Sequence, residues 1–295
     1  MISPSTSHDA HRRIARWPHS LLAALALAFL AVALDAVLPG LPGAHASLIG
    51  RLTIFLSGIC PQRPAHSYTL DGVQLPIEAR MIGIFGGLVV GIVELATVGW
   101  RRSRRWPRRA VAVTLLAGFS AMVFDGFNAL FFDLGLPHLY APDLRVRLGT
   151  GILAGLALAF VLAPTLALVT GNEADEAADE GAEEVKASTC PDWRDLGCAA
   201  GGGGLIAVGV ASGWSPLLYP AALLSATGVI LAWLLLNVIA LNSMVGGTTA
   251  PRYVGRRLAW RGWWLLSLSV VLAVAELALL AVVRGMVFGI SLGVR

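Results

Sequence analysis

The acidic side chains inside apolar stretches are the residues of this sequence best suited to chemistry. Glu94 and Asp125 each interrupt a long apolar run, and Asn128 follows Asp125 three positions later, on the same face of a helix. An ionisable group inside a membrane helix costs on the order of 2.5–3.5 kcal/mol, so it needs a partner, water or a proton. Counted from the expected outer helix ends, the depths of Glu94 and Asp125 differ by about 4–5 Å. We therefore expect these two carboxylates to be neighbours, as a proton relay or a cation site requires.

Other polar residues extend this set of candidates. Glu276 lies midway along a later apolar run, and Asp35 lies near the outer end of the first. The alternative for each carboxyl is a neutral acid that is hydrogen-bonded to backbone or serine. Arg80 and Arg147, with Arg63 and Arg145 near them, have the guanidinium forks that bind lipid phosphate. Arginines at helix ends also commonly anchor the membrane interface.

A metal site is a further alternative. Cys60, His66 and Glu78 are admissible zinc ligands, with His138 or His45 as a fourth. Their spacing matches no zinc pattern, and loop cysteines and histidines are more often ordinary loop residues. The sequence also has no nucleotide-binding glycine loop and no nucleophile elbow. It indicates no cofactor and favours a protein without enzymatic activity.

Glycines recur at helical spacing in several apolar runs. Gly83, Gly87 and Gly91 fall on one helical face with Arg80 and Glu94. Small residues at this spacing let two membrane helices approach closely. Gly151 and Gly155 repeat the pattern in a later run. These five glycines therefore predict helix packing.

The composition is that of an integral membrane protein. The chain has 295 residues, 56% of them hydrophobic and 14% charged, with a mean hydropathy of +0.73. Soluble domains carry roughly 25% charged residues. The sequence pI near 9.3 reflects arginine clusters between apolar runs, which indicate topology rather than nucleic-acid binding.

The apolar runs predict an all-α polytopic fold with about seven transmembrane helices. Residues 1–19 form a polar tail, and Ala44-His45-Ala46 resembles a signal-peptidase site, but the run from Ser20 to Leu38 is long enough to be a retained span. A short amphipathic piece, Ser47–Ile59, is expected at the interface. The predicted spans are Ser20–Leu38, Met81–Trp100, Ala110–Leu134, Leu148–Thr170, Cys198–Trp214, Ala221–Val245 and Gly262–Val283.

These spans divide the chain into a membrane core over residues 20–170, with an outer loop at 39–80, and a three-helix extension over 198–295. Residues 171–197 carry seven acidic residues between Glu173 and Glu184 and are expected to form a solvated linker. The arginine-rich segments 101–109 and 251–261 are both cytoplasmic if the N-terminus is inside and the C-terminus outside. This places the 39–80 loop and the 135–147 turn together on the outer face of a bacterial cytoplasmic (inner) membrane.

Residues 60–87 resemble the signature of a family of prokaryotic membrane proteins, the domain of unknown function 2085. The resemblance covers about residues 45–165, and Asp125-Gly126 and Arg147-Leu-Gly-Thr-Gly151 look like two further landmarks of that family. The matching positions of the first segment, with Phe85 at a family tyrosine, are Cys60, Gln62, Ser67, Gly72, Pro76, Ala79, Arg80, Gly83, Ile84 and Gly87.

The departures from the family pattern concern its cysteines and histidine. Pro61 stands where the family has histidine, and Glu78 and Met81 stand where it has two cysteines. Arg80, Asp125 and Arg147 are retained. The resemblance therefore implies a polar network rather than metal chemistry, and it brings no known activity.

The function that these observations favour is a non-catalytic membrane component. It would be an accessory subunit or a protein that binds lipid or ions in an outward-facing polar pocket, and its partners would be membrane lipids and other membrane subunits. The alternatives are a small proton- or ion-coupled transporter that uses the intramembrane carboxylates, and an enzyme acting on a lipid-linked substrate.

Overall fold

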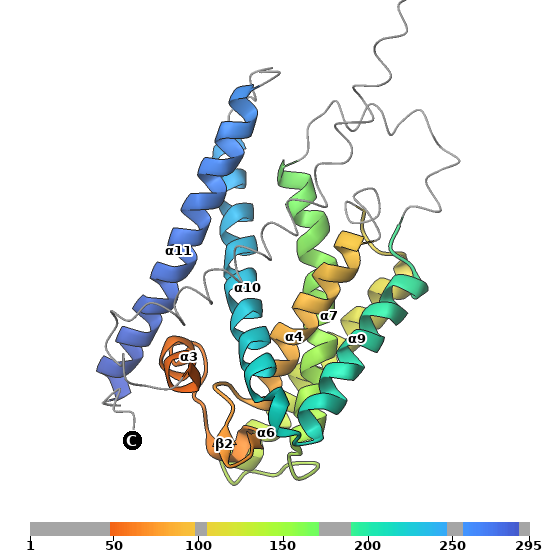
Figure 1. The fold of residues 1–295 in the computed structure, drawn as a ribbon. Helices are drawn as coiled ribbons and strands as arrows, with labels where there is room; N and C mark the ends of the chain where they lie inside the picture. Colours follow the sequence, from red (N-terminus) through yellow and green to blue (C-terminus); the bar gives the residue numbers. More distant parts are fainter. Residues whose placement is uncertain (1–47, 98–104, 171–189, 247–255, 289–295) are drawn as a thin grey trace, which may run out of the picture.

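The computed structural model describes residues 48–97, 105–170, 190–246 and 256–288. Seven α-helices, two short 3-10 helices and one hairpin make up these residues, so the predicted all-α fold is confirmed (Figure 1). The α-helices are α3 (Leu48–Leu56), α4 (Ala79–Thr97), α6 (Arg109–Asp133), α7 (Leu144–Thr170), α9 (Trp193–Ala211), α10 (Leu218–Gly246) and α11 (Arg256–Phe288). The short elements are η1 (Pro64–His66), β1 (Thr69–Leu70), β2 (Val73–Gln74) and η3 (Ser215–Leu217).

Five of the described helices are long and apolar enough to cross a membrane. They are α4, α6, α7, α10 together with η3, and α11. The helix α9 has 19 residues but includes six glycines and the charged pair Arg194 and Asp195, and it falls outside this group. The first predicted span, 20–38, lies outside the described residues. The chain is therefore a multi-pass membrane protein, and the count of seven spans stays a prediction.

The long helices run in alternating directions. The Arg108 backbone N–H donates to the Pro191 carbonyl, which places the start of α6 beside the start of α9. Arg284, near the end of α11, donates to the carbonyls of Ser57 and Cys60. One end of the bundle thus holds α3, the hairpin and the 134–143 turn (Figure 1). We call it the outer end, after the charge-based prediction.

The two helices at the centre of the bundle are α4 and α7, and glycines form their contact. A side chain at Gly87 would have its Cβ 2.5 Å from the Ile152 carbonyl oxygen, and one at Gly155 would collide with the Ile84 carbonyl. Gly83 and Gly151 lie at the same contact, nearer the outer end. The helix backbones therefore touch, as the glycine spacing indicates.

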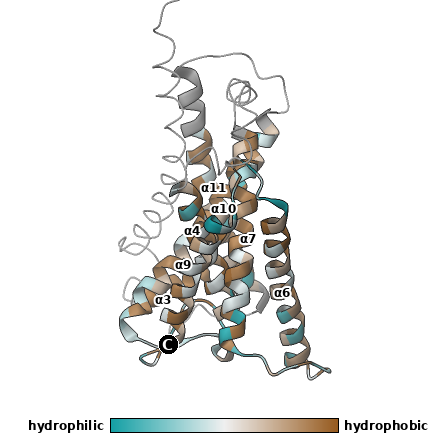
Figure 2. Ribbon diagram, turned by 90° about the vertical axis from the view of Figure 1, so that its right-hand side faces the viewer, coloured by the Kyte–Doolittle hydropathy of each residue, from teal (hydrophilic) through white to brown (hydrophobic). Residues whose placement is uncertain are grey.

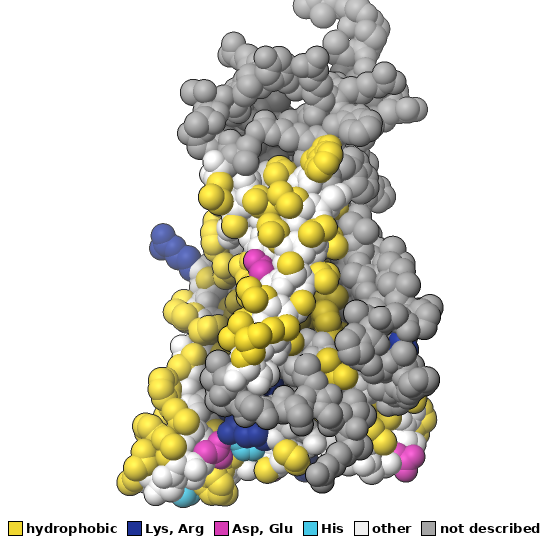
Figure 3. Space-filling model, turned by 90° about the vertical axis from the view of Figure 1, so that its left-hand side faces the viewer, with side chains coloured by type: hydrophobic (Ala, Val, Ile, Leu, Met, Phe, Trp, Pro, Cys, Tyr) yellow, Lys and Arg dark blue, Asp and Glu magenta, His cyan; other side chains and the backbone are white. Residues whose placement is uncertain are grey.

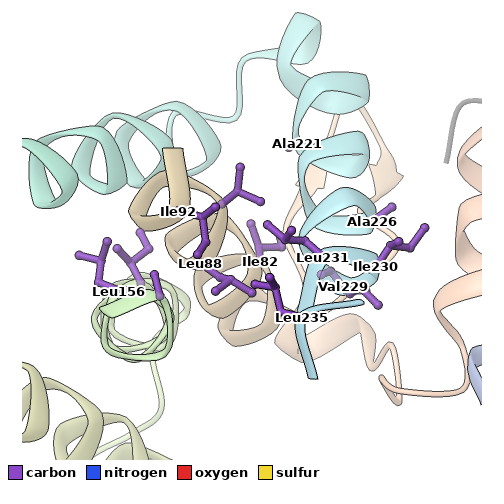
Figure 4. Close-up of a cluster of buried hydrophobic side chains, with 14 of the residues drawn as sticks. Ile82, Leu88, Ile92, Leu156, Ala221, Ala226, Val229, Ile230, Leu231 and Leu235 are labelled. Atoms are coloured by element: carbon purple, nitrogen blue, oxygen red, sulfur yellow. The ribbon is translucent and has the colours of Figure 1, made fainter. Parts of the chain in front are cut away.

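The branched side chains of α4 face the other way, toward α10. Ile82, Leu88 and Ile92 lie between α7 and the α10 residues Leu231 and Leu235 (Figure 4). These five residues are almost completely buried. The central helix therefore meets α7 through glycines, and it meets α10 through bulky aliphatic side chains together with a close approach of Gly228 to Phe85.

By contrast, α6 lies at the edge of the bundle (Figure 2). Only 22% of the most apolar 18-residue stretch of α6 is buried, against 61% of the corresponding stretch of α4. Phe124, Phe127 and Leu130 are among its exposed side chains. An apolar face of this kind suits contact with lipid chains. A polar residue of α6 that turns inward is therefore a candidate for a structural or functional contact.

The start of α9 differs from the sequence-based prediction. The acidic linker was expected to reach residue 197 and the fifth span to begin at Cys198, but α9 begins at Trp193. Asp192 caps it by accepting from the backbone of Arg194 and Asp195, while Asp195 accepts from the Asp192 N–H. Such a capping box is visible in sequence as two acidic residues three positions apart.

The α4–α7 contact makes a testable prediction about two glycines of the same helix. Gly155→Ala places a Cβ against α4 backbone, and we expect it to destabilise the protein by about 1–3 kcal/mol. Gly149→Ala is the matched control, because no described atom lies within 4 Å of its added Cβ. Alanine there should be neutral or stabilise by up to about 1 kcal/mol. Thermal unfolding in detergent tests both, and equal effects would contradict this packing.

Candidate functional site

The outer loop is held by the side chain of Gln62. Its Nε2 donates to the Thr53 carbonyl at 2.7 Å and to the Pro76 carbonyl at 2.8 Å. Gln74 Nε2 donates back to the Gln62 carbonyl at 2.8 Å. One amide therefore ties α3 to the segment that enters α4, and the loop becomes a fixed cover over the outer end of the bundle.

A hairpin in this loop was not predicted. Thr69 pairs with Gln74 and Leu70 with Val73 around the two-residue turn Asp71-Gly72. Both turn residues have positive φ, 53° and 76°. Asp-Gly is a typical sequence for such a turn, so the signal was present in the sequence.

Arg63 forms two ion pairs, one with Glu78, the residue just before α4, and one with the end of α6. Arg63 Nε lies 3.0 Å from Glu78 Oε1, and Arg63 Nη1 lies 2.8 Å from Asp133 Oδ2 at the end of α6. Burial disfavours the charged form of Glu78, but the hydrogen bonds and charge of Arg63 outweigh it, and the pKa of Glu78 lies below its usual value. Glu78 is therefore an ionised structural partner of Arg63.

Asp125 of α6 is almost completely buried, with 1% of its surface exposed, and among the described carboxylates only Asp195 is as deeply buried. Arg80 Nη2 donates to Asp125 Oδ2 at 2.5 Å, and Tyr140 OH donates to Asp125 Oδ1 at 2.7 Å. Burial, together with this hydrogen bond, raises the pKa of Tyr140 to about 12. Asp125 thus turns inward from the lipid-facing helix and joins α6 to α4 and to the 134–143 turn.

Asn128, one turn beyond Asp125, shapes that turn. Its Nδ2 donates to the Tyr140 carbonyl at 2.9 Å, and its Oδ1 accepts from the Leu139 N–H at 2.8 Å. Asn128 is buried, and the hydrogen bonds of its side chain go to backbone atoms of the turn. It positions Tyr140 for its bond to Asp125.

Several buried polar groups at this end lack a hydrogen-bond partner among the described residues. Arg147, in the first turn of α7, is 5% exposed, and its side chain makes no hydrogen bond to the residues that the structure describes. His66 Nδ1 and Arg80 Nε are buried and also without a hydrogen-bond partner. Burial and the charges of Arg147 and Arg63 hold the pKa of His66 below its usual value.

We call this group the outer polar cluster. Its charged side chains come from the outer loop, α4, α6 and α7, and charged side chains gather toward the lower end of the face seen in Figure 3. Three arginines balance three carboxylates when His66 is neutral. The members are Arg63, His66, Glu78, Arg80, Asp125, Asp133, Tyr140 and Arg147.

The candidate metal ligands have other neighbours. Cys60 Sγ accepts from the Glu78 backbone N–H at 3.3 Å, and burial raises the pKa of its thiol. His66 Nδ1 lies 3.7 Å from Glu78 Oε2. Over the described ranges, no group of three or more histidine, cysteine or acidic residues is arranged to hold a metal ion. The structure therefore adds no support for a metal site at Cys60, His66 and Glu78.

Glu94 and Asp125 are not brought together, contrary to expectation. Asp125 is paired with Arg80 in the first turn of α4, while Glu94 lies 14 residues further along that helix, about 21 Å away. The charge of Glu94 interacts instead with those of Asp195 and Arg194 at the start of α9. Counting depth from predicted span ends failed because the α6 residue Asp125 lies level with Arg80, not with Glu94.

Glu276 forms a separate contact in the C-terminal helices. Asn237 Nδ2 of α10 donates to its Oε2 at 3.0 Å. This pair joins α10 to α11, outside the outer polar cluster. Asn237 was not among the predicted residues.

Two members of the cluster were also missed. Asp133 ends an apolar run, and Tyr140 lies in a polar turn, so neither stands out by its position in the sequence. Only the return of the chain over the end of α6 gives these residues their partners. A buried carboxylate such as Asp125 needs hydrogen-bond donors for both of its oxygens. This need was the one indirect sign in the sequence that a second donor such as Tyr140 had to lie nearby.

Comparison with known families places the cluster within a shared segment. Residues 60–161 match a family model described as "Predicted membrane protein (DUF2085)", which confirms the resemblance. The match contains all eight cluster residues, and α9, α10 and α11 lie beyond it. Comparisons with curated proteins and with solved structures give no match.

The Arg80–Asp125 pair gives a prediction about stability. Asp125→Asn removes the charge-assisted bond, and we expect a loss of about 1.5–3 kcal/mol. Asp71→Asn is the control, because Asp71 lies exposed in a turn and asparagine tolerates its positive φ. In a double-mutant cycle, Arg80→Gln should cost less in the Asp125→Asn background. Additive effects in thermal unfolding would show that the pair is not coupled.

A second prediction concerns pH and Glu78. Since its pKa is lowered in the folded state from an ordinary 4.5, the unfolded chain takes up the proton first as pH falls. The stability that Glu78 contributes is therefore present above pH 4.5 and lost as pH falls through its folded pKa. Thermal unfolding of wild type and Glu78→Gln, compared from neutral to acidic pH, should show a difference that shrinks below pH 4.5. A difference independent of pH would contradict the ion pair with Arg63.

Proposed function

We propose that this protein is a non-catalytic membrane component that binds a small ligand, a lipid or an ion, at its outer polar cluster. The observation that carries the proposal is a set of polar groups on three elements without a hydrogen-bond partner among the described residues. Two are the fully buried atoms His66 Nδ1 on η1 and Arg80 Nε on α4, and the third is the Arg147 side chain on α7, which is 5% exposed. Leaving a buried polar group unsatisfied costs about 1–3 kcal/mol. A ligand that supplies the acceptors removes this cost.

The carboxylates of the cluster argue against catalysis. A general base needs a pKa near the working pH and room for a substrate proton. Glu78 has a lowered pKa and is bonded to Arg63, and both oxygens of Asp125 already accept hydrogen bonds. These groups suit a structural role better than acid–base chemistry.

The distribution of ionisable residues argues against a transport path. Between Arg80 and Glu94, α4 carries none, and beyond Arg147, α7 carries none. A proton relay through the described part of the matched segment would have to cross the tight glycine contact of α4 with α7. The glycine face of α4 is also filled by α7, so a partner subunit would need another surface.

The test is purification in mild detergent followed by native mass spectrometry. We expect wild type to retain a non-covalent lipid or ion, and Arg80→Gln to lose it, since Arg80 both frames the cluster and holds Asp125. Arg105→Gln, at the opposite end of the bundle, should retain it. An adduct that both variants keep, or a well-folded wild type that carries none and gains no thermal stability from added lipids and salts, would contradict the proposal. Equally, a stoichiometric protein partner that survives both substitutions would favour an accessory subunit instead.

A further inference from the structure

We infer that the ligand is an oxyanion of the phosphate type, bound by Arg147 together with Arg80 Nε and His66 Nδ1, and that in the membrane it is the phosphate of a lipid headgroup. This inference rests on the proposed function and specifies its ligand. The three groups come from α7, α4 and η1, and all are buried at the outer end.

Arg147 is the central observation. Its charge interacts electrostatically with His66 and with two other arginines, Arg80 and Arg63. It therefore experiences repulsion within a buried site while its five N–H donors have no acceptor among the described residues. A structural arginine in such a place would be expected to bond to the nearest carboxylate.

The nearby carboxylates are already engaged by other donors. Glu78 and Asp133 accept from Arg63, and Asp125 accepts from Arg80 and Tyr140. Asp125 and Asp133 attract Arg147 only at longer range. The network is thus complete without Arg147, which leaves its fork available.

The character of the free groups selects an anion. A guanidinium donates and never accepts, so it cannot bind a cation, and it matches the spacing of two oxygens on phosphate. Water would occupy the donors but carries no charge to pair with the guanidinium of Arg147. A phosphate group accepts from several donors at once, and hydrogen bonds to charged groups are the stronger ones.

Position in the bundle favours a lipid as the source of the phosphate. Arg80 is the second residue of α4, and Arg147 is the fourth residue of α7, so both lie where these helices reach the expected headgroup level. The α6 helix beside them is largely exposed, as expected of a helix that faces lipid. A headgroup can therefore approach the cluster while its acyl chains remain beside α6.

The balance of charge adds a dependence on pH. With His66 neutral, three arginines offset Glu78, Asp125 and Asp133, so a bound monoanion leaves the cluster with one excess negative charge. Protonation of His66, which faces Glu78, Asp133, Arg63 and Arg147, restores neutrality. Because the pKa of His66 lies below 6.5 in the free protein, binding of an anion with constant charge should therefore strengthen as pH falls from about 7 to about 5.

The experiment uses the full chain, purified and stripped of lipid, in detergent. One arm titrates phosphatidylglycerol, with a diacylglycerol that lacks phosphate as the chain-matched control, and another arm titrates inorganic sulfate. Phosphodiesters and sulfate keep their charge across this pH range. We expect phosphatidylglycerol to raise the thermal unfolding temperature and diacylglycerol to leave it unchanged. If sulfate stabilises the protein as well as phosphatidylglycerol does, the site binds an oxyanion, but the inference that the oxyanion belongs to a lipid is wrong.

Arg147→Gln should weaken phosphatidylglycerol binding about tenfold or more, the loss of one charged hydrogen-bonding group. Arg145→Gln is the matched control, because Arg145 is exposed on the same helical turn. It should bind like wild type. Arg147→Gln breaks no hydrogen bond between described residues, so we expect it to fold, and Arg147→Lys, which keeps the charge but loses the fork, gives a second readout with intermediate affinity. His66→Gln should remove the pH dependence.

Two results separate this inference from the proposed function. If a ligand is lost in Arg80→Gln but bound equally by Arg147→Gln and wild type, the oxyanion assignment is wrong and the ligand site remains. If wild type binds neither phosphatidylglycerol nor sulfate and retains no other ligand, both proposals are overturned. Equal losses in Arg147→Gln and Arg145→Gln would indicate general surface charge and would also overturn the assignment.

Discussion

The contact between the backbones of α4 and α7 is the constraint on which the outer polar cluster depends. Because Gly83, Gly151 and Gly155 have no side chains, the two helices touch, and the Arg80 carbonyl lies against Gly151. One turn from that point, α7 presents Arg147. The packing therefore brings two arginines together at the outer end. Their repulsion in a buried setting has to be offset by negative charge, and Asp125 supplies part of it.

Asp125 shows how a peripheral helix contributes to this end. Most of α6 faces outward, yet its buried carboxylate accepts from Arg80 and Tyr140. The 134–143 turn is held in turn by Asn128. Polar interactions of Asp125 thus hold α6 in place although the helix makes few apolar contacts. In a membrane this is reasonable, because apolar burial gives little preference between protein and lipid, whereas a satisfied polar pair specifies one arrangement.

The outer loop and the C-terminal extension meet at the same end. Glu78, which stands where the family has a cysteine, is an ion-pair partner of Arg63 rather than a metal ligand in the described structure. Arg284 of α11 donates to the carbonyls of Ser57, Cys60 and Pro61. The extension beyond the matched segment therefore fixes the loop that covers the cluster, and the two parts of the chain share one outer surface.

The sequence by itself determined the class of fold and the helix-packing faces. Apolar run length fixes which segments can span a membrane, and the spacing of Gly83 and Gly87 fixes a smooth face, because both are local properties of one helix. Which polar residues share a site was decided by tertiary structure alone. Asp125 meets Arg80 and not Glu94 because the axial offset between α6 and α4 is set by packing and by the connecting turns. The sequence of neither helix encodes that offset, and a shift of a few helical turns would pair Asp125 with a different residue of α4.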